Sequence, residues 1–181
     1  LVARGYQSGL ALEVNPEGPG ILLKNLAGHA LPTADPERAY RIDAFLQDRD
    51  RNIVATDSLR IGQRWDWGDP TKEIPPRRLA DERLSPGESR WWYPTLSADN
   101  AVYLVVEATH VRLQEDYLAG MAATQLDAPL LALWPEAATL LPQISELYPR
   151  ATRVYHEEIS LETGARRVDR NPVMAVPRSE K

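Results

Sequence analysis

Apolar and polar residues alternate over several short stretches of this chain, with the two-residue period of a β-strand that has one buried face. Strand-like segments with this alternation, or with short apolar runs, cover residues 8–14, 20–26, 39–48, 52–62, 88–96, 101–113 and 151–162. Turn-forming residues 15–20 separate the first pair and polar residues 48–52 separate the second, so each pair is predicted to form a hairpin. The apolar centre of 101–113 predicts a strand that is buried on both faces.

Two segments break this pattern. Residues 63–87 contain four prolines and many charges, which predicts a long loop that crosses between sheets, with room for a short strand. Residues 134–148 are predicted to form a small helical insertion, because Pro135 suits a first helical turn and apolar residues recur every three positions. These apolar residues are Ala138, Leu141, Ile144 and Leu147. Pro142 predicts two short helical pieces, or a kink, in place of one straight helix.

The order of these elements predicts an all-β protein. About seven to nine strands separated by turn signals, with one helical insertion, are typical of a Greek-key or Ig-like β-sandwich. The long proline-rich crossing favours Greek-key connections over a simple meander. We expect one sandwich domain over residues 1–165 and a C-terminal tail over residues 166–181.

Composition narrows the function. The 181 residues are 43% hydrophobic and 26% charged, and their net charge of −5 gives no attraction to nucleic acid or to an anionic membrane. No apolar run approaches the roughly 20 residues needed to cross a bilayer. The chain has no cysteine, so disulfides, thiolate metal sites and a covalent Cys-x-x-Cys-His haem attachment within it are excluded. Because it begins with Leu1 and shows no signal peptide, we expect a processed product or a fragment of a longer protein.

The three histidines are the candidate ligands. His29, His110 and His156 are too far apart in the sequence for a local metal motif, so a site would have to be assembled in space. His110 ends the strongest strand and His156 lies in the last one; the alternative for both is a surface or hydrogen-bonded histidine. His29 is expected to be held on a constrained loop between Gly28 and Pro32, either presented to a ligand or bonded to its own loop.

The tryptophans are the second group of candidates. Trp65 and Trp67 are expected to share a face, and one of the consecutive Trp91, Trp92 and Tyr93 must point outward if they lie in a strand. Such aromatic residues could bind sugar rings, pack on another domain or cover a cofactor edge, and core packing is the alternative. No Gly-x-Ser-x-Gly motif or glycine-rich phosphate loop is present, which favours a non-catalytic protein.

Two sequence motifs resemble a known family. Asn25, Gly28, His29, Pro32, Thr33 and Arg41 match a strand ending in Asn, a Gly-His-x-x-Pro-Thr loop and an Arg-containing strand. Asp81, Arg83, Leu84, Pro86, Gly87 and Glu88 match an Asp-x-Arg-Leu-x-Pro-Gly-Glu segment. Together they resemble the cysteine-free C-terminal β-sandwich region of multihaem c-type cytochromes. The resemblance covers roughly residues 9–113, and it departs from the family where the glycine after Pro-Thr is Ala34.

This resemblance implies a setting in electron transfer. It implies an exported accessory or docking domain, in the periplasm or at the cell surface, whose partner is a multihaem cytochrome domain or another redox protein. It also implies that His29 is a distal ligand to a haem contributed by another domain or chain.

A fainter resemblance is to the surface-associated copper-binding proteins of methane-oxidising bacteria, whose cysteine-free site combines two histidines with a modified tryptophan. It implies a mononuclear copper site built from two of His29, His110 and His156 with Trp65 or Trp67. A third hypothesis is a carbohydrate- or protein-binding module that uses Trp65, Trp67, Trp91 or Trp92. We favour the cytochrome-associated domain among the three.

Overall fold

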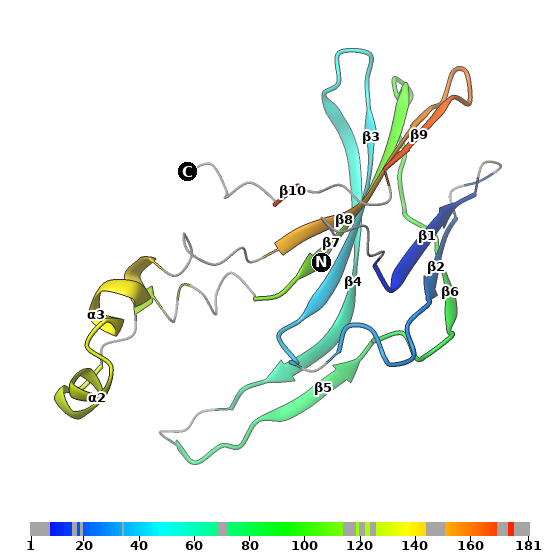
Figure 1. Ribbon diagram of the computed structural model, residues 1–181. Coiled ribbons are helices and arrows are strands. Elements are labelled where there is room, and N and C mark those ends of the chain that lie inside the picture. Colours follow the sequence, from blue (N-terminus) through cyan, green and yellow to red (C-terminus); the bar gives the residue numbers. More distant parts are fainter. Residues whose placement is uncertain are drawn as a thin grey trace.

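The computed structural model describes residues 8–15, 18, 20–33, 35–68, 72–113, 119, 122–123, 126–143, 151–169 and 174–175. The described strands form two antiparallel sheets (Figure 1). The small sheet has the order β1-β2-β6, with bounds β1 Leu10–Val14, β2 Ile21–Asn25 and β6 Ser89–Trp92. The large sheet has the order β10-β8-β7-β3-β4-β5, and β9 also pairs with β8. Its strands are β3 Ala39–Gln47, β4 Ile53–Asp66, β5 Arg77–Asp81, β7 Tyr103–Val111, β8 Ala151–Ser160, β9 Arg166–Asp169 and β10 Met174–Ala175.

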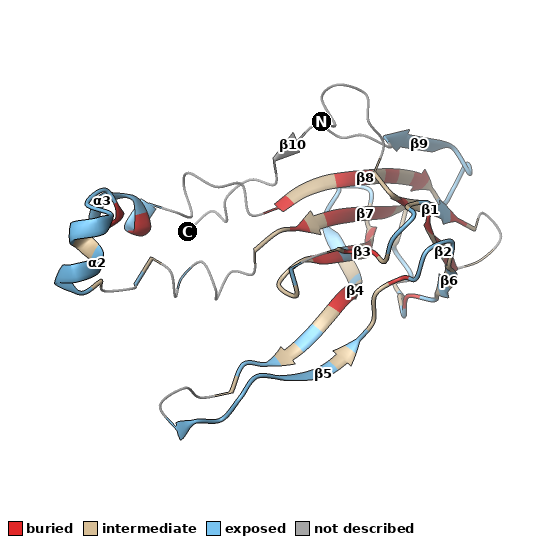
Figure 2. Ribbon diagram, turned by 60° about the horizontal axis from the view of Figure 1, so that its bottom comes forward, coloured by how far each residue is buried: buried red, intermediate tan, exposed pale blue. Residues whose placement is uncertain are grey.

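The core lies between the facing sides of the two sheets, as the alternation predicts (Figure 2). The small sheet contributes apolar side chains from alternate positions of β1 and β2, and the large sheet contributes them from β3, β4, β7 and β8. The buried members are Leu10, Leu12, Val14, Ile21, Leu23, Leu31, Tyr40, Ile42, Ala44, Ile61, Leu84, Val106, Ala108, Val154, Tyr155 and Ile159. The all-β sandwich expected from the sequence is therefore confirmed.

The strand predicted to be buried on both faces, β7, lies in the middle of the large sheet between β3 and β8. Val105 and Val106 are both buried, although they point to opposite faces. In β8 an irregularity opposite Ala108 and Thr109 adds one residue, so that Val154 and Tyr155 both enter the core. Strict alternation would put Val154 on the same face of β8 as His156, and this extra residue is why Val154 lies inside.

The chain passes between the sheets through residues 26–38, 82–88 and 93–102. The first of these connections contains the Gly-His-x-x-Pro-Thr loop, and the second contains most of the Asp-x-Arg-Leu-x-Pro-Gly-Glu segment. Repeated crossing between sheets is the expected departure from a simple meander.

The expected long loop at 63–87 is shorter than the sequence suggests. The strand that begins at Ile53 continues as far as Asp66, and β5 pairs with its last residues. These two strands extend from the sandwich as a two-stranded arm (Figures 1 and 2). The crossing itself is reduced to residues 82–88. Because charged residues lie on both faces of the arm, its strands do not show the alternation of apolar and polar residues by which a strand is predicted from sequence.

The helical insertion begins earlier than predicted. Helix α2 spans Ala128–Leu133 and is capped by the Asp127 side chain, and α3 spans Ala137–Leu140. A 3₁₀ turn, η3, follows at Leu141–Gln143 and contains Pro142, so the predicted division into short pieces is confirmed. Ile144 and Leu147 lie outside the described residues. The helices lie to one side of the sheets (Figure 1).

Within the segment expected to be a tail, Arg166–Asp169 forms β9 and pairs with β8. All four of its residues are exposed, which explains why a pattern based on burial does not find it. The division into a domain over 1–165 and a tail over 166–181 stays a prediction. None of the helices in the described part of the chain is long and apolar enough to cross a membrane.

Candidate functional site

The two segments that carry the sequence motifs meet in space. They belong to the first and second connections between the sheets, and they are joined by a two-way backbone bridge between Leu31 and Leu84. The Leu31 N–H donates to the Leu84 carbonyl at 2.9 Å, and the Leu84 N–H donates to the Leu31 carbonyl at 3.0 Å. Both leucine side chains are buried in the core. We call this junction of residues 25–33 and 81–90 the crossover junction.

Asn25 is the polar centre of the crossover junction. It ends β2 and is only 2% exposed. Its Nδ2 lies 2.8 Å from the His29 carbonyl, 3.0 Å from the Leu84 carbonyl and 2.9 Å from the Ser85 carbonyl. Its Oδ1 accepts from the Ala27 N–H at 2.8 Å. One side chain therefore bonds to backbone groups of both crossing segments and links them to each other.

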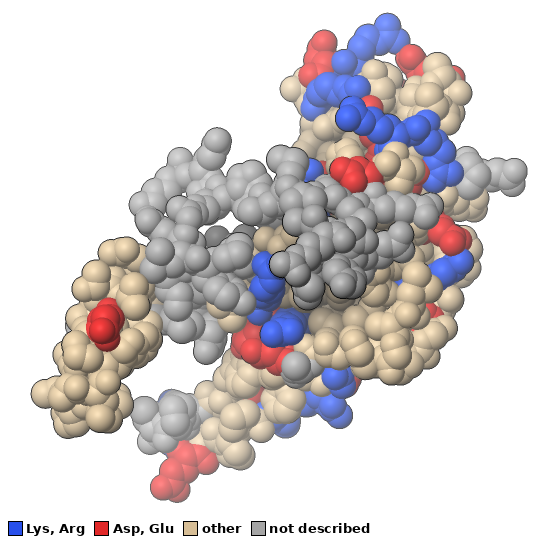
Figure 3. Space-filling model, in the orientation of Figure 1, with Lys and Arg blue, Asp and Glu red and all other residues tan. Residues whose placement is uncertain are grey.

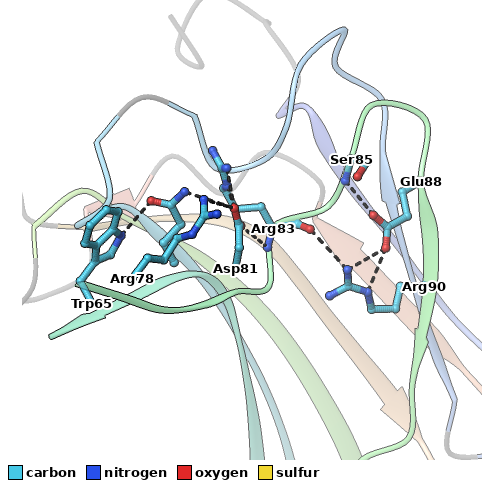
Figure 4. Close-up of polar contacts among 8 residues, drawn as sticks. Trp65, Arg78, Asp81, Arg83, Ser85, Glu88 and Arg90 are labelled. Carbon is cyan, nitrogen blue, oxygen red and sulfur yellow. Dashed lines mark hydrogen bonds and ion pairs between the residues drawn. The ribbon is translucent and has the colours of Figure 1, made fainter.

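The acidic residues of the second motif hold the shape of its own segment (Figure 4). Glu88 accepts from the Ser85 N–H at 2.7 Å and from Arg90 at 2.7 Å, and Arg90 also donates to the Glu82 carbonyl at 3.0 Å. The Ser85 N–H and Arg90 lower the pKa of Glu88. The motif carboxylates are thus charged partners within the loop.

Asp81 behaves in the same way at the start of this segment. It accepts two hydrogen bonds from the Arg83 guanidinium, at 2.8 and 2.7 Å. Hydrogen bonding by Arg83, and by Gln63, lowers the pKa of Asp81 well below its usual range. A carboxylate this strongly held in its charged form is suited to a structural role rather than to proton transfer near neutral pH.

His29 lies on the exposed side of the crossover junction. Its Nδ1 is 3.2 Å from the carbonyl of Ala30. Because a carbonyl oxygen can only accept, this contact requires the proton on Nδ1 and leaves the lone pair on Nε2. Pro32, after a cis peptide bond, is buried. At Gly28 an added Cβ would meet nothing within 4 Å and φ is not positive. Contrary to the expectation from the sequence, this turn therefore does not require glycine.

The other two histidines lie in the large sheet, on opposite faces. His110 is paired in register with Tyr40 and stacks on its ring, with the centroids 4.9 Å apart. Burial, helped by Arg112 and Arg38, lowers the pKa of His110 to about 4. His156 is opposite Glu107, and its Nδ1 lies 2.9 Å from a Glu107 carboxylate oxygen.

The structure does not bring the three histidines together. Glu107 is opposite Asp43 in β3, three residues from Tyr40, so the partners of His156 and His110 point to different faces of the sheet. Among the residues that the structure describes, no group of three or more His, Cys, Asp or Glu side chains could hold a metal ion. His110 and His156 are thus separated by the sheet, and a copper site built from two histidines and a tryptophan stays a prediction.

The tryptophans form two separate clusters. Trp65 in β4 stacks on Trp67, with the ring centroids 5.8 Å apart, and its Nε1 donates to Gln63 at 3.0 Å. Trp91 in β6 stacks on Tyr93 with centroids 6.1 Å apart, and both are exposed. Trp92 faces inward and packs against the core. The expectation that part of the Trp91–Tyr93 run points outward is confirmed.

Sequence reasoning missed the role of Asn25, and it named Tyr93 only as one of three aromatic residues of which one must point outward. An Asn at the end of a strand is an ordinary turn signal, and its three carbonyl partners come from segments that a local pattern cannot connect. Tyr93 could have been found, because strand alternation places it on the same face as Trp91.

Comparisons with known proteins add little. No protein-family model matches the sequence, and no curated protein matches it either. One matching solved structure is a penta-heme cytochrome c552 from Thermochromatium tepidum, with a TM-score of 0.48 and 20% identity over 67% of this chain. This chain spans 35% of that cytochrome. The likeness is to a cytochrome, but at this strength it establishes neither a family nor a function for the chain.

Proposed function

We propose that this chain is a non-catalytic docking domain of an exported multihaem electron-transfer cytochrome. In this proposal the haem belongs to another domain or chain, since the absence of cysteine excludes covalent attachment here. His29 is the distal ligand that the sandwich presents to the iron. The periplasm or the cell surface is the corresponding location.

The observation that carries the proposal is the crossover junction. The two motifs that resemble the cytochrome-associated sandwich lie more than 50 residues apart, between Asn25 and Asp81, and they fold into one hydrogen-bonded unit. The His29 side chain is exposed, whereas Asn25, Asp81 and Glu88 accept or donate hydrogen bonds within the unit. A rigid base under an exposed imidazole is the arrangement that an axial ligand requires.

The residues present fit a haem held by a partner. The Ala30 carbonyl accepts from Nδ1 and so leaves Nε2 as the donor atom for iron. The same contact fixes the orientation of the ring. Asn25 holds the backbone of His29 by its carbonyl. When bound, the haem supplies reversible one-electron chemistry, and the axial ligand helps to set its potential.

The test is the spectrum of the intact haem-containing protein to which this chain belongs or binds. His29→Ala should convert one haem from low-spin to high-spin in electron paramagnetic resonance and optical spectra, because its sixth ligand is lost. His156→Ala is the matched control, since this imidazole also lies at the surface of the sandwich but is bonded to Glu107. Unchanged haem spectra in His29→Ala would exclude the ligand role.

The docking role has a separate readout. Binding of the wild-type and His29→Ala chains to the purified haem-bearing partner is measured by isothermal titration calorimetry. Docking predicts binding by both chains, with the variant weaker by the loss of the iron–imidazole bond. The docking role is excluded if the wild-type chain does not bind such a partner and is not part of the same polypeptide as a haem-bearing domain.

A further inference from the structure

The outer face of the small sheet carries an exposed aromatic pair that the proposed function does not use. Trp91 is 47% exposed and Tyr93 is 64% exposed, and they lie on the side of the sheet opposite the core. Their rings are inclined by only 21° to each other, with centroids 6.1 Å apart. The two rings are therefore nearly parallel neighbours. We call Trp91 and Tyr93 the aromatic strip.

Gly20 leaves room for both rings of the strip. A Cβ at this position would lie 3.0 Å from the Tyr93 ring and 3.1 Å from the Trp91 ring. A side chain at residue 20 would therefore displace the two rings. With glycine there, both rings stay close to the backbone of the sheet and keep a large exposed aromatic surface, which stacking with a ligand requires.

Polar groups lie across the same face of the small sheet. Trp91 is opposite Leu22 in β2, and Leu22 is opposite Glu13 in β1. Glu13 forms an ion pair of 2.7 Å with Lys24. Beyond Leu22 the face thus carries a hydrogen-bonding pair whose charges cancel, which is complementary to a neutral ligand rather than to a charged one.

We propose that the aromatic strip binds a neutral polysaccharide, whose pyranose rings pack against the exposed parts of Trp91 and Tyr93. A pyranose ring has an apolar C–H face that matches an aromatic face, and equatorial hydroxyl groups around its rim. The hydroxyls reach the paired Glu13 and Lys24 side chains, which can accept and donate hydrogen bonds. A few polar groups beside an apolar platform fix the orientation of such a ligand.

The second aromatic pair lacks these features. Trp65 is partly buried and its Nε1 is bonded to Gln63, so Trp67 alone is exposed in that pair. It lies at the end of the β4–β5 arm, among Arg64, Arg77 and Asp66, which form ion pairs there. The aromatic strip is consequently the better sugar platform.

The test is binding of cellohexaose, chitohexaose and xylohexaose to the full chain, followed by tryptophan fluorescence and isothermal titration calorimetry. The wild-type chain should bind at least one of them. Trp91→Ala should weaken that binding by about tenfold, because one stacked ring is worth about 1.4 kcal/mol. Trp91→Phe should retain most of the affinity, since a ring face remains.

Trp134→Ala is the matched control, because Trp134 is 48% exposed and lies at the end of α2, away from the small sheet. It should bind as tightly as the wild-type chain. Thermal unfolding of each variant confirms that the fold is intact, and Trp91→Phe keeps the test valid if Trp91→Ala unfolds.

Three results overturn the proposal: no binding of any of the three sugars by the wild-type chain, equal weakening by Trp134→Ala, or full affinity in Trp91→Ala. Loss of binding to a haem-bearing protein in Trp91→Ala, without sugar binding, would instead make the strip a protein interface.

Discussion

At the scale of single residues, Asn25 holds the crossover junction together. Replacing it by alanine leaves the carbonyls of His29, Leu84 and Ser85 and the N–H of Ala27 without this partner. Asn25→Ala should therefore lower the free energy of unfolding by about 2–4 kcal/mol. Urea denaturation with linear extrapolation measures this loss.

Asn52→Ala is the control for Asn25→Ala. Its side chain is exposed and bonds to Asp48 within one turn, so the loss should be within about 1 kcal/mol. Equal effects of the two substitutions would contradict the central position of Asn25. With His29 as the haem ligand proposed above, Asn25→Ala should also loosen His29 and broaden the spectrum of that haem.

His110 gives a second prediction at this scale. Burial, Arg112 and Arg38 lower its pKa to about 4, below the ordinary value of about 6.5 in an unfolded chain. Between these two values the unfolded state binds more protons, so His110 contributes stability above pH 6.5 that is lost as the pH falls toward 4. His110→Phe, which keeps a ring over Tyr40, should flatten the pH dependence of stability in this range.

The direct measurement is a proton NMR titration of the imidazole signals. With three histidines in the sequence, each signal can be assigned by substitution. A titration midpoint near pH 6.5 for His110 would contradict its burial and the influence of Arg112 and Arg38.

At the scale of elements, the sequence pattern finds strands that have one buried face. β1, β2, β3 and β8 each place buried side chains at alternating positions over most of their length, and all were predicted. β9 has four exposed residues and β5 has exposed residues at four of its five positions. These strands form by pairing with an existing neighbour rather than by covering the core, and a local pattern of burial contains no such information.

A prediction at this scale concerns the β8–β9 hairpin. Glu157 in β8 is fully buried and accepts from Tyr155 and from Arg166 in β9. Arg166 also donates to the Val14 carbonyl at 3.1 Å and so ties the hairpin to the small sheet. Arg166→Met should cost about 2–3 kcal/mol, less than the roughly 3–5 kcal/mol of a fully buried pair, because Arg166 is partly exposed.

Two further variants separate charge from packing at this position. Arg167→Met changes the exposed neighbour in the same strand and should have little effect in the same denaturation experiment. Glu157→Gln combined with Arg166→Met should recover stability relative to Arg166→Met alone, because no buried charge is left without a partner. If Arg166→Met and Arg167→Met are equally mild, the ion pair does not stabilise the hairpin.

At the scale of the whole molecule, the sequence predicted the two-sheet architecture but not how the candidate site is assembled. The fold class follows from many short amphipathic strands, each of which is visible locally. The crossover junction depends on contacts between residues near 31 and residues near 84, which come from different connections between the sheets. Such long-range pairing is decided by the core as a whole, in which Leu31 and Leu84 are buried together. On the face that Figure 3 shows, the described Lys and Arg side chains lie interspersed with Asp and Glu side chains over the sheets.

The last prediction is that the two proposed surfaces act independently. The aromatic strip lies at the Gly20 end of β2, where Trp91 is opposite Leu22, and the crossover junction lies at the other end, beside Asn25. The separation along the strand is about 10–13 Å at 3.3 Å per residue, far enough for substitutions to be additive. Trp91→Ala should therefore leave the haem spectrum unchanged, and His29→Ala should leave the affinity for the hexasaccharides unchanged. The double variant should show both losses and no more, measured by the same spectra and titrations. If a bound hexasaccharide shifts the haem spectrum, or if Trp91→Ala releases the iron ligand, the two ends of the small sheet are coupled and the surfaces form one site.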